Sequence, residues 1–184
     1  SARKEQKPVV VSSAVGGVTD LIINAGKKAA KGVIEFEQIK QRHNEIIENL
    51  DLNPKIIETQ LDELKETLDV LSELKQFDKK AYDTLVSFGE RLSTRILAAY
   101  FNSKGLKARQ YDAFEIGFVT DDNFSNAEIL PETYENIKQK LTDFESVPIV
   151  TGFIAKTKRA EITTLGRGGS DYTATIIARI LHDL

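Results

Sequence analysis

The stretch VVVSSAVGGVTDLIINAGKKAA, residues 9–30, decides the fold class. Its three successive valines are typical of a strand that is buried on both faces, as the strands of parallel sheets are. Gly16 and Gly17 follow as a turn of small residues, and Leu21 and Ile22 then lie on one face of a helix. A strand, a turn and a helix form the first half of a βα unit, so this stretch predicts an α/β protein.

Strands and helical segments alternate along the rest of the chain. Between residues 33 and 80, apolar side chains recur every three or four residues on either side of Asn53 and Pro54, where asparagine would cap a second helix and proline would open it. The two segments predict an antiparallel helical hairpin, whose apolar stripe we expect to pack within the domain rather than against a partner. Further strands are expected over residues 7–13, 108–112, 117–120, 148–154 and 162–165, and further helices from Asp78 or Asp83 to Gly105, from Pro131 to before Pro148, and from Ser170 onward.

The composition limits the classes of function. The chain has 184 residues, with 25 Lys and Arg against 28 Asp and Glu, so its formal net charge of −3 does not favour a nucleic acid as partner. It has no cysteine, and its two histidines, His43 and His182, are isolated, so no metal site is expected. No apolar run approaches the roughly 20 residues that a membrane span needs, and the charged N-terminus does not resemble a signal peptide. We therefore expect a cytoplasmic, single-domain protein that binds neither membrane nor nucleic acid.

Two candidate sites involve small residues and a charged pair. Gly16 and Gly17 follow the first strand, where ligands of α/β sheets collect, and could let backbone N–H groups approach an anion, although an ordinary tight turn is the commoner explanation. Glu90 and Arg91 lie in a helical segment between the apolar residues Phe88 and Leu92, which favours one of the two charges pointing inward rather than a solvated charged face. A buried carboxylate requires a cationic partner, such as the ammonium group of a substrate.

The most specific local signal is TTLGRGGSDY, residues 163–172. Its glycines would free the backbone to wrap an anion, and Arg167 offers two parallel donors to a carboxylate. Ser170 or Asp171 would act as an ordinary helix cap if the segment had no ligand. That alternative does not explain an arginine placed between glycines, so the segment predicts an anion-binding loop.

Five motifs together resemble those of the aspartate kinases, within the amino-acid kinase superfamily. They occur in the order and at roughly the spacing of that family, and the last of them is highly specific to it. The resemblance implies a three-layer α/β fold with a mainly parallel sheet between helices, in which residues 1–184 form a partial catalytic domain and residues 33–80 a helical insertion. The motifs are VVVSSAVGGVTD at residues 9–20, SFGERLSTRILA at 87–98, TDDNFSNAEI at 120–129, VPIVTGFI at 147–154 and ITTLGRGGSDYTA at 162–174.

The resemblance also implies an activity and a set of roles. The reaction is ATP-dependent phosphorylation of the side-chain carboxylate of L-aspartate to 4-phospho-L-aspartate, the first step towards lysine, threonine, methionine and isoleucine, with Mg²⁺ carried by the nucleotide. The parent protein would be a homo-oligomer, such as a dimer, and would be plastidic if it came from a plant. The implied roles are Glu90 for the substrate ammonium, Arg167 for its α-carboxylate, Ser13 and Thr19 beside the reacting carboxylate, Ser170 and the backbone of Phe153 for substrate binding, Asp171 for orienting the catalytic lysine, and Gly16, Gly17, Gly168 and Gly169 for phosphate.

The chain departs from the family pattern at both ends. The Lys-Phe-Gly-Gly-Thr-Ser strand that holds the phosphates in the family does not precede Ser1, and the chain stops at Leu184, before the segment that binds the nucleotide base and ribose. We expect truncation rather than natural loss, and little or no kinase activity from this chain alone. Another carboxylate- or phosphate-directed kinase of the superfamily, or a non-catalytic aspartate-binding or assembly module, is an alternative; the combination of Glu90 and Arg167 favours an α-amino acid as substrate.

Three other charged features have simpler explanations. Asp121 and Asp122 are expected to shape a turn, and residues 156–161 to form a solvated hairpin tip. His43 lies on an apolar helical stripe and is expected to be a packed histidine rather than a ligand.

Overall fold

The computed structural model describes residues 8–141 and 145–182. The valine-rich stretch forms strand β1 (Val10–Ser12), and the chain then enters helix α1 (Val18–Ala29), as predicted; Lys7, where the predicted strand began, lies outside the described residues. Gly17 precedes the helix with a φ of 80°, a left-handed conformation that glycine adopts without strain. The first βα unit is therefore confirmed.

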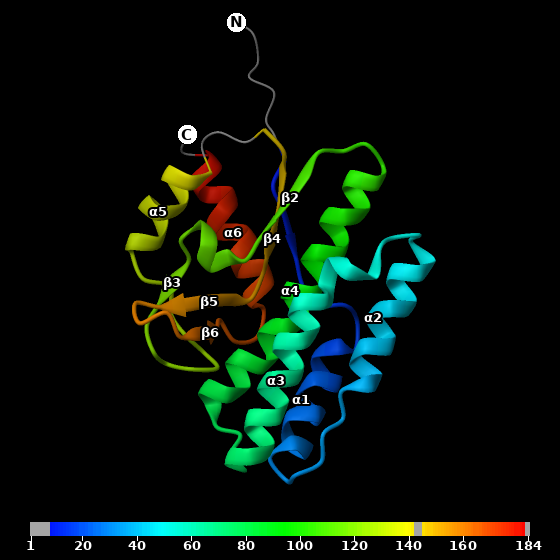
Figure 1. Cartoon of the computed structure of the whole chain (residues 1–184). Helices are drawn as coiled ribbons and strands as arrows, with labels where there is room; N and C mark the ends of the chain where they lie inside the picture. The colour runs from blue at the N-terminus through cyan, green and yellow to red at the C-terminus, as the bar shows by residue number, and fades with distance from the viewer. Residues whose placement is uncertain (1–7, 142–144, 183–184) are drawn as a thin grey trace, which may run out of the picture.

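The predicted helical hairpin is also confirmed. Helix α2 (Glu37–Asn49), a short 3₁₀ turn η1 (Pro54–Ile57) and helix α3 (Glu58–Leu74) follow, and α2 and α3 run in opposite directions (Figure 1). The side chain of Asn53 caps η1 by accepting a hydrogen bond from the backbone N–H of Lys55 at 3.0 Å. Most apolar residues of the hairpin are buried in one core with those of α1 and of the next helix, so they serve packing within the domain, whereas Val70 and Leu74 on α3 are exposed.

Helix α4 (Lys79–Ser103) crosses the whole molecule (Figure 1). It begins after Asp78, whose carboxylate accepts a hydrogen bond from the backbone N–H of Ala81 at 2.8 Å, and the chain turns away from it at Gly105, where φ is 81°. Asp83, the alternative helix start, instead lies inside the helix and is fully buried.

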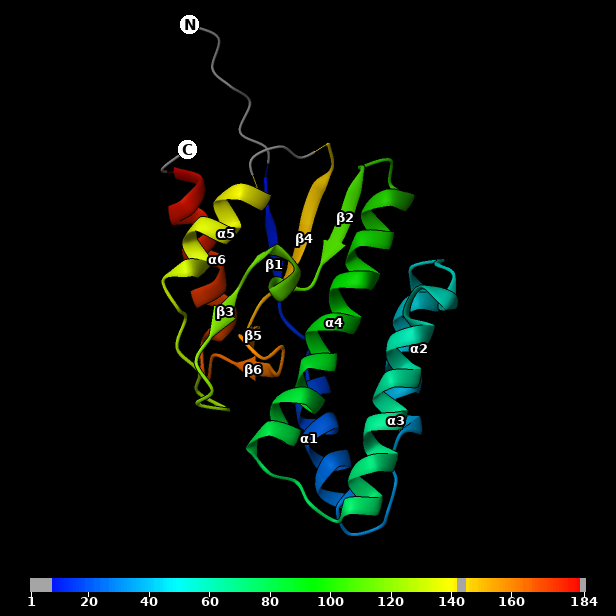
Figure 2. The same cartoon turned by 60° about the vertical axis from the view of Figure 1, so that its left-hand side comes forward.

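A parallel sheet lies between two layers of helices (Figure 2). Among the described residues it contains three strands in the order β1-β4-β2, with β2 at Ala108–Tyr111 and β4 at Val147–Thr151. Helix α4 packs against one face, while α5 (Glu132–Lys140) and α6 (Gly169–His182) cover the other. This arrangement confirms the expected three-layer α/β fold with a parallel sheet.

A second small sheet, again counting only described residues, has the order β3-β5-β6. Its strands are β3 (Val119–Thr120), which follows the 3₁₀ turn η2 (Ala113–Ile116), then β5 (Ile154–Thr157) and β6 (Ile162–Thr164). β3 and β5 pair in parallel, whereas β5 and β6 form an antiparallel hairpin.

Three boundaries expected from sequence are wrong. The segment 148–154 is not one strand, because Phe153 takes a φ of 65° after Gly152 and directs the chain from β4 in the first sheet to β5 in the second. Lys156 lies in β5, its Nζ 3.8 Å from the centroid of the Phe114 ring, rather than at the hairpin tip. The last helix begins at Gly169, so Ser170 and Asp171 lie in its first turn and do not cap it.

His43 is fully buried, and its Nδ1 lies 2.7 Å from the carbonyl oxygen of Ile39, as expected of a packed histidine. No helix within residues 8–141 and 145–182 is both long enough and apolar enough to cross a membrane.

Candidate functional site

The carboxyl ends of β1 and β4 bring two of the predicted motifs together. Ser12 is paired with Thr151 in the parallel register, and the backbone N–H of Gly152 donates to the carbonyl oxygen of Ser12 at 2.9 Å. The N-terminus of α6 meets the same edge, because a Cβ atom at Gly152 would lie 2.6 Å from the Cβ of Ser170. Glycine at residue 152 is therefore what allows α6 to approach the strand ends.

Glu90 points from α4 towards the loop after β1. Its side chain is buried, and its Oε1 accepts a hydrogen bond from the backbone N–H of Ala14 at 3.3 Å, with a further hydrogen bond from the side chain of Ser13. Within the described part of the chain, Oε2 is buried and has no hydrogen-bond partner. Desolvation by burial raises the pKa of the Glu90 carboxyl to about 7, outweighing these hydrogen bonds. The site thus contains a buried carboxylate oxygen that still requires a donor.

Arg91 does not neutralise Glu90. Its guanidinium pairs with Glu63 on α3 at 2.6 Å and with Asp112, just after β2, at 3.3 Å. Arg95, one turn further along α4, pairs with Asp112 at 3.1 Å. These observations confirm that Glu90 is the charge that points inward, as the sequence predicted for one of the two.

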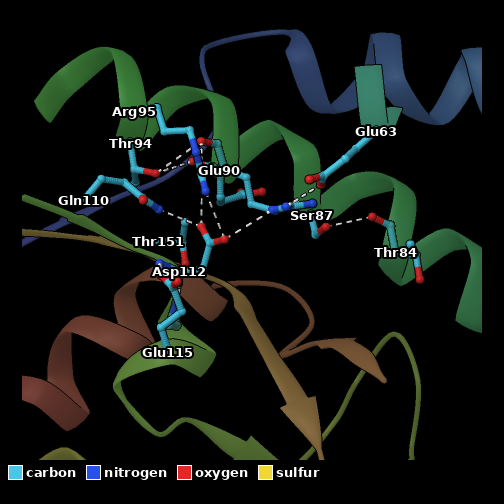
Figure 3. A network of polar contacts seen from close by, with 12 residues as sticks. Glu63, Thr84, Ser87, Glu90, Thr94, Arg95, Gln110, Asp112, Glu115 and Thr151 are labelled. Carbon is cyan, nitrogen blue, oxygen red and sulfur yellow. Dashed lines mark hydrogen bonds and ion pairs between the residues drawn. The ribbon is translucent and has the colours of Figure 1, made fainter. Parts of the chain in front are cut away.

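Side chains from the helix and from the sheet converge on Asp112 (Figure 3). Besides the two arginines, it accepts a hydrogen bond from Nε2 of Gln110 at 2.7 Å, while its backbone N–H donates to Glu115 at 2.6 Å. The next backbone N–H, that of Ala113, donates to Oγ1 of Thr151 at 2.7 Å. This network joins α4 to the carboxyl ends of β2 and β4 and so sets the rotation of the helix that carries Glu90.

Arg167 lies in a cleft of about 530 Å³ between α4, the end of β6 and the β4–β5 junction. Gly166 and Gly168 on either side of it have φ values of 72° and 78°, which explains the glycines around the arginine. Among the residues that the structure describes, none forms an ion pair or hydrogen bond with its exposed guanidinium. The cleft is lined by Lys27, Phe77, Asp78, Lys79, Tyr82, Ser125, Phe153, Thr164, Gly166 and Arg167.

The other predicted residues lie around this edge with different surroundings. Gly16, Gly17 and Gly168 face open space, since no described atom lies within 4 Å of a Cβ built on any of them. Gly169 is instead packed, because its Cβ would lie 2.8 Å from the ring of Phe153. The side chains of Thr19 and Asp171 form no hydrogen bond or ion pair with another described residue of the predicted site.

The amino-acid sequence matches the family model "Amino acid kinase family" over residues 1–182. This chain belongs to the amino acid kinase family. It is 47% identical to aspartokinase 1, chloroplastic, of Arabidopsis thaliana over 96% of its own length and 33% of that protein. It therefore spans about a third of that relative.

Solved structures of the amino acid kinase family show the same fold. A structure of E. coli aspartokinase III in complex with lysine and aspartate matches with a TM-score of 0.78 at 28% identity, over 95% of this chain and 40% of that one. A structure of the same enzyme in complex with aspartate and ADP matches with a TM-score of 0.74 at 27% identity, over the same shares of the two chains.

Sequence reasoning missed Asp83 in this member of the family. Its carboxylate accepts hydrogen bonds from the backbone N–H groups of Ser125 and Thr164 at 2.8 and 3.0 Å and from Oγ1 of Thr164 at 2.7 Å. A signal was present, because Asp83, Ser87, Glu90 and Thr94 are spaced by four, three and four residues and so share one face of the helix. All four are buried.

Proposed function

We propose that the chain is the aspartate-binding part of an aspartate kinase, which transfers a phosphoryl group from ATP to the side-chain carboxylate of L-aspartate and so forms 4-phospho-L-aspartate. The unpartnered, buried Oε2 of Glu90 beside the loop after β1 carries this proposal. An ammonium group supplies the hydrogen-bond donor and the positive charge that this oxygen lacks. The relatives named aspartokinases, one of them solved with aspartate and ADP, support the choice of substrate.

Arg167 supplies the second half of substrate recognition in this proposal. Its guanidinium is exposed in the cleft and unpaired among described residues, and it would bind the α-carboxylate through two parallel hydrogen bonds. Phe153 lines the same cleft, and Ser170 packs against Gly152 beside it. An ammonium on Glu90 and an α-carboxylate on Arg167 together specify an α-amino acid, which neither group does alone.

The reacting carboxylate would then face the loop after β1. Ser13 and Thr19 flank the exposed Gly16 and Gly17, whose backbone N–H groups precede the N-terminus of α1 and favour negative charge. Gly168 and Gly169, at the start of α6, would bind phosphate in the same way. Asp171 would orient the catalytic lysine. Phosphoryl transfer depends on such positioning and charge stabilisation rather than on covalent chemistry by the protein.

The cosubstrate would be ATP with Mg²⁺ bound to its phosphates. No group of three or more His, Cys, Asp or Glu side chains in residues 8–141 and 145–182 could hold a metal ion, so the proposal assigns the ion to the nucleotide. A parent protein that is a dimer or larger, and α2 and α3 as an insertion in the kinase domain, stay predictions. A plastid location of a plant parent is supported by the chloroplastic Arabidopsis relative.

Calorimetric titration of L-aspartate into the chain tests the proposal. We expect saturable binding that Arg167→Ala weakens at least a hundredfold, while Arg42→Ala, which removes an exposed arginine from α2, leaves it unchanged. L-aspartate that fails to bind a cooperatively folded chain would refute the proposed site. Binding of a different carboxylate in its place would identify another kinase of the superfamily.

A further inference from the structure

The Arg167 loop, residues 165–168, is held along its backbone although the arginine side chain is unpaired among described residues. Just before it, the carbonyl oxygen of Thr164 accepts a hydrogen bond from the backbone N–H of Ala127 at 2.9 Å. The backbone N–H of Leu165 donates to the carbonyl oxygen of Phe153 at 2.9 Å. Gly166 packs so closely on Asn126 that a Cβ would lie 2.5 Å from Oδ1 of that side chain.

One buried carboxylate joins these supports to α4. Asp83 accepts hydrogen bonds from the backbone N–H and Oγ1 of Thr164, which lies three residues before Arg167. It also accepts one from the backbone N–H of Ser125, next to the asparagine that packs on Gly166. Asp83 therefore contacts both segments that flank the Arg167 loop, although it lies more than 40 residues away from either in sequence.

Asp83 also shares its helix with Glu90. The two residues are seven positions apart, about two turns, and so lie on the same face of α4. Tyr82, next to Asp83, lines the cleft that contains Arg167. Movement of the β6 end relative to α4 would change the separation of Arg167 from Glu90, and the Asp83 side chain joins α4 to the residue that ends β6.

We propose that Asp83 is a positioning residue, which holds the Arg167 loop at the distance from Glu90 that an α-amino acid requires. Its role in substrate binding rests on the proposed function; its role in placing the loop does not. The donors to its carboxylate are neutral N–H and O–H groups, and burial raises the pKa of the Asp83 carboxyl. Its hydrogen-bond geometry, rather than an ion pair, therefore does the positioning.

A double-mutant cycle in calorimetric titrations with L-aspartate tests the role in binding. We expect Asp83→Ala to weaken binding at least tenfold, and Asp62→Ala, which removes an exposed aspartate on α3, to leave it unchanged. In an Arg167→Lys background, Asp83→Ala should weaken binding less than threefold, because the arginine that it positions is already gone. Equal losses in both backgrounds would show that Asp83 acts independently of Arg167 and would overturn the proposal.

Two milder variants keep the test valid if Asp83→Ala does not fold. Asp83→Asn retains an oxygen that accepts from both backbone N–H groups, and its amide N–H can donate to Oγ1 of Thr164. We therefore expect binding within threefold of the unmodified chain. Thr164→Val keeps the shape of the side chain but removes one donor, and should weaken binding three- to tenfold. A loss in Asp83→Asn as large as that in Asp83→Ala would contradict a role based on hydrogen bonds.

Amide chemical shifts separate this proposal from the proposed function. In spectra of the chain without ligand, we expect Asp83→Ala to shift or broaden the backbone signals of Gly166, Arg167 and Gly168, and Asp62→Ala to leave them in place. If the unmodified chain does not bind L-aspartate, the proposed function fails, and these signals alone decide whether Asp83 positions the loop. Unchanged signals in Asp83→Ala would overturn the positioning role.

Discussion

At Glu90, burial in the folded chain favours the neutral form of the carboxyl group, whereas the proposed binding of a substrate ammonium favours the charged form. Burial removes the carboxylate from water, and the hydrogen bond from Ala14 compensates only one of its oxygens. The pKa of the Glu90 carboxyl is therefore raised to about 7 in the folded chain, so the group keeps its proton up to about that pH. An ammonium in the site would favour the charged form, so ligand binding and loss of this proton are coupled.

The first prediction concerns the pH dependence of stability. Between the ordinary pKa of 4.5 and the folded value of about 7, the folded chain binds more protons at Glu90 than the unfolded chain does. The free energy of unfolding should therefore fall as pH rises through this window, by about 3 kcal/mol from this group. Urea unfolding at pH 5 and pH 8 measures it: Glu90→Gln should lack this fall and be more stable than the unmodified chain at pH 8. An equal fall in both proteins would contradict the assignment.

The second prediction concerns the pH dependence of binding. Below pH 7 the Glu90 proton must leave before an ammonium can bind, so the affinity for L-aspartate should fall by up to tenfold for each pH unit below about 7. Calorimetry at pH 6, 7 and 8 should show weaker binding at pH 6 and little change between the two higher values. Affinity that rises as the pH falls would refute Glu90 as the ammonium ligand.

Close approach between elements depends on small residues and on buried charge. At the β4–β5 junction, Gly152 allows the N-terminus of α6 to contact the strand ends, so that Ser170 lies beside the loop of Phe153. On the other face of the sheet, Asp112 joins two turns of α4 to the end of β2 through arginines that are only 11% and 18% exposed. The contact at Gly152 sets how near α6 lies to the strand ends, and the ion pairs of Asp112 set the rotation of α4.

The third prediction tests the α6 contact. A Cβ at residue 152 would lie 2.8 Å from the Cα of Ser170. This clash can be relieved only if the backbone moves. Gly152→Ala should therefore destabilise the chain by about 2 kcal/mol, as overpacking commonly does, and weaken L-aspartate binding. Gly16→Ala is the matched control, since open space surrounds that residue in the described structure, and should leave stability unchanged in chemical denaturation. Equal stability of the two variants would show that α6 does not depend on this contact.

The fourth prediction tests the arginine network. Asp112→Ala leaves Arg91 without one of its partners and Arg95 without the carboxylate with which it pairs, and the cost should be about 3 kcal/mol because these side chains are largely buried. Asp69→Ala removes an exposed pair with Lys65 and should cost less than about 0.5 kcal/mol. Denaturant titrations of the two variants compare them directly, and losses of similar size would contradict a structural role for Asp112.

In the whole molecule, the proposed site lies between two hydrophobic cores. One core is formed by the helices α1 to α4, and the other by the sheet strands with η2, α5 and α6. Phe153 packs against the helical core, to whose helix α4 Glu90 belongs, whereas Arg167 follows Leu165 of the other core. A ligand bound by both Glu90 and Arg167 would tie the two cores together.

The fifth prediction is that L-aspartate stabilises the whole chain. A ligand present at a hundred times its dissociation constant should raise the free energy of unfolding by about 2.7 kcal/mol. Thermal unfolding with and without L-aspartate should show this as a higher midpoint, and Arg167→Ala should abolish the shift at the same concentration. A midpoint that stays the same for the unmodified chain at saturating L-aspartate would contradict a ligand that bridges the cores.

The sequence by itself determined the α/β class, the helical hairpin and the inward direction of one charge of the Glu90 and Arg91 pair, because hydrophobic period, caps and glycines act over a few residues. Only the tertiary structure decided that residues 148–154 belong to two sheets, since the turn at Phe153 is imposed by packing from α6 and the helical core. It likewise decided that Asp83 supports the Arg167 loop, because the helical spacing that Asp83 shares with Glu90 does not identify hydrogen-bond partners 42 and 81 residues away. Local chemistry specifies the elements, and long-range packing sets the distances between the groups they carry.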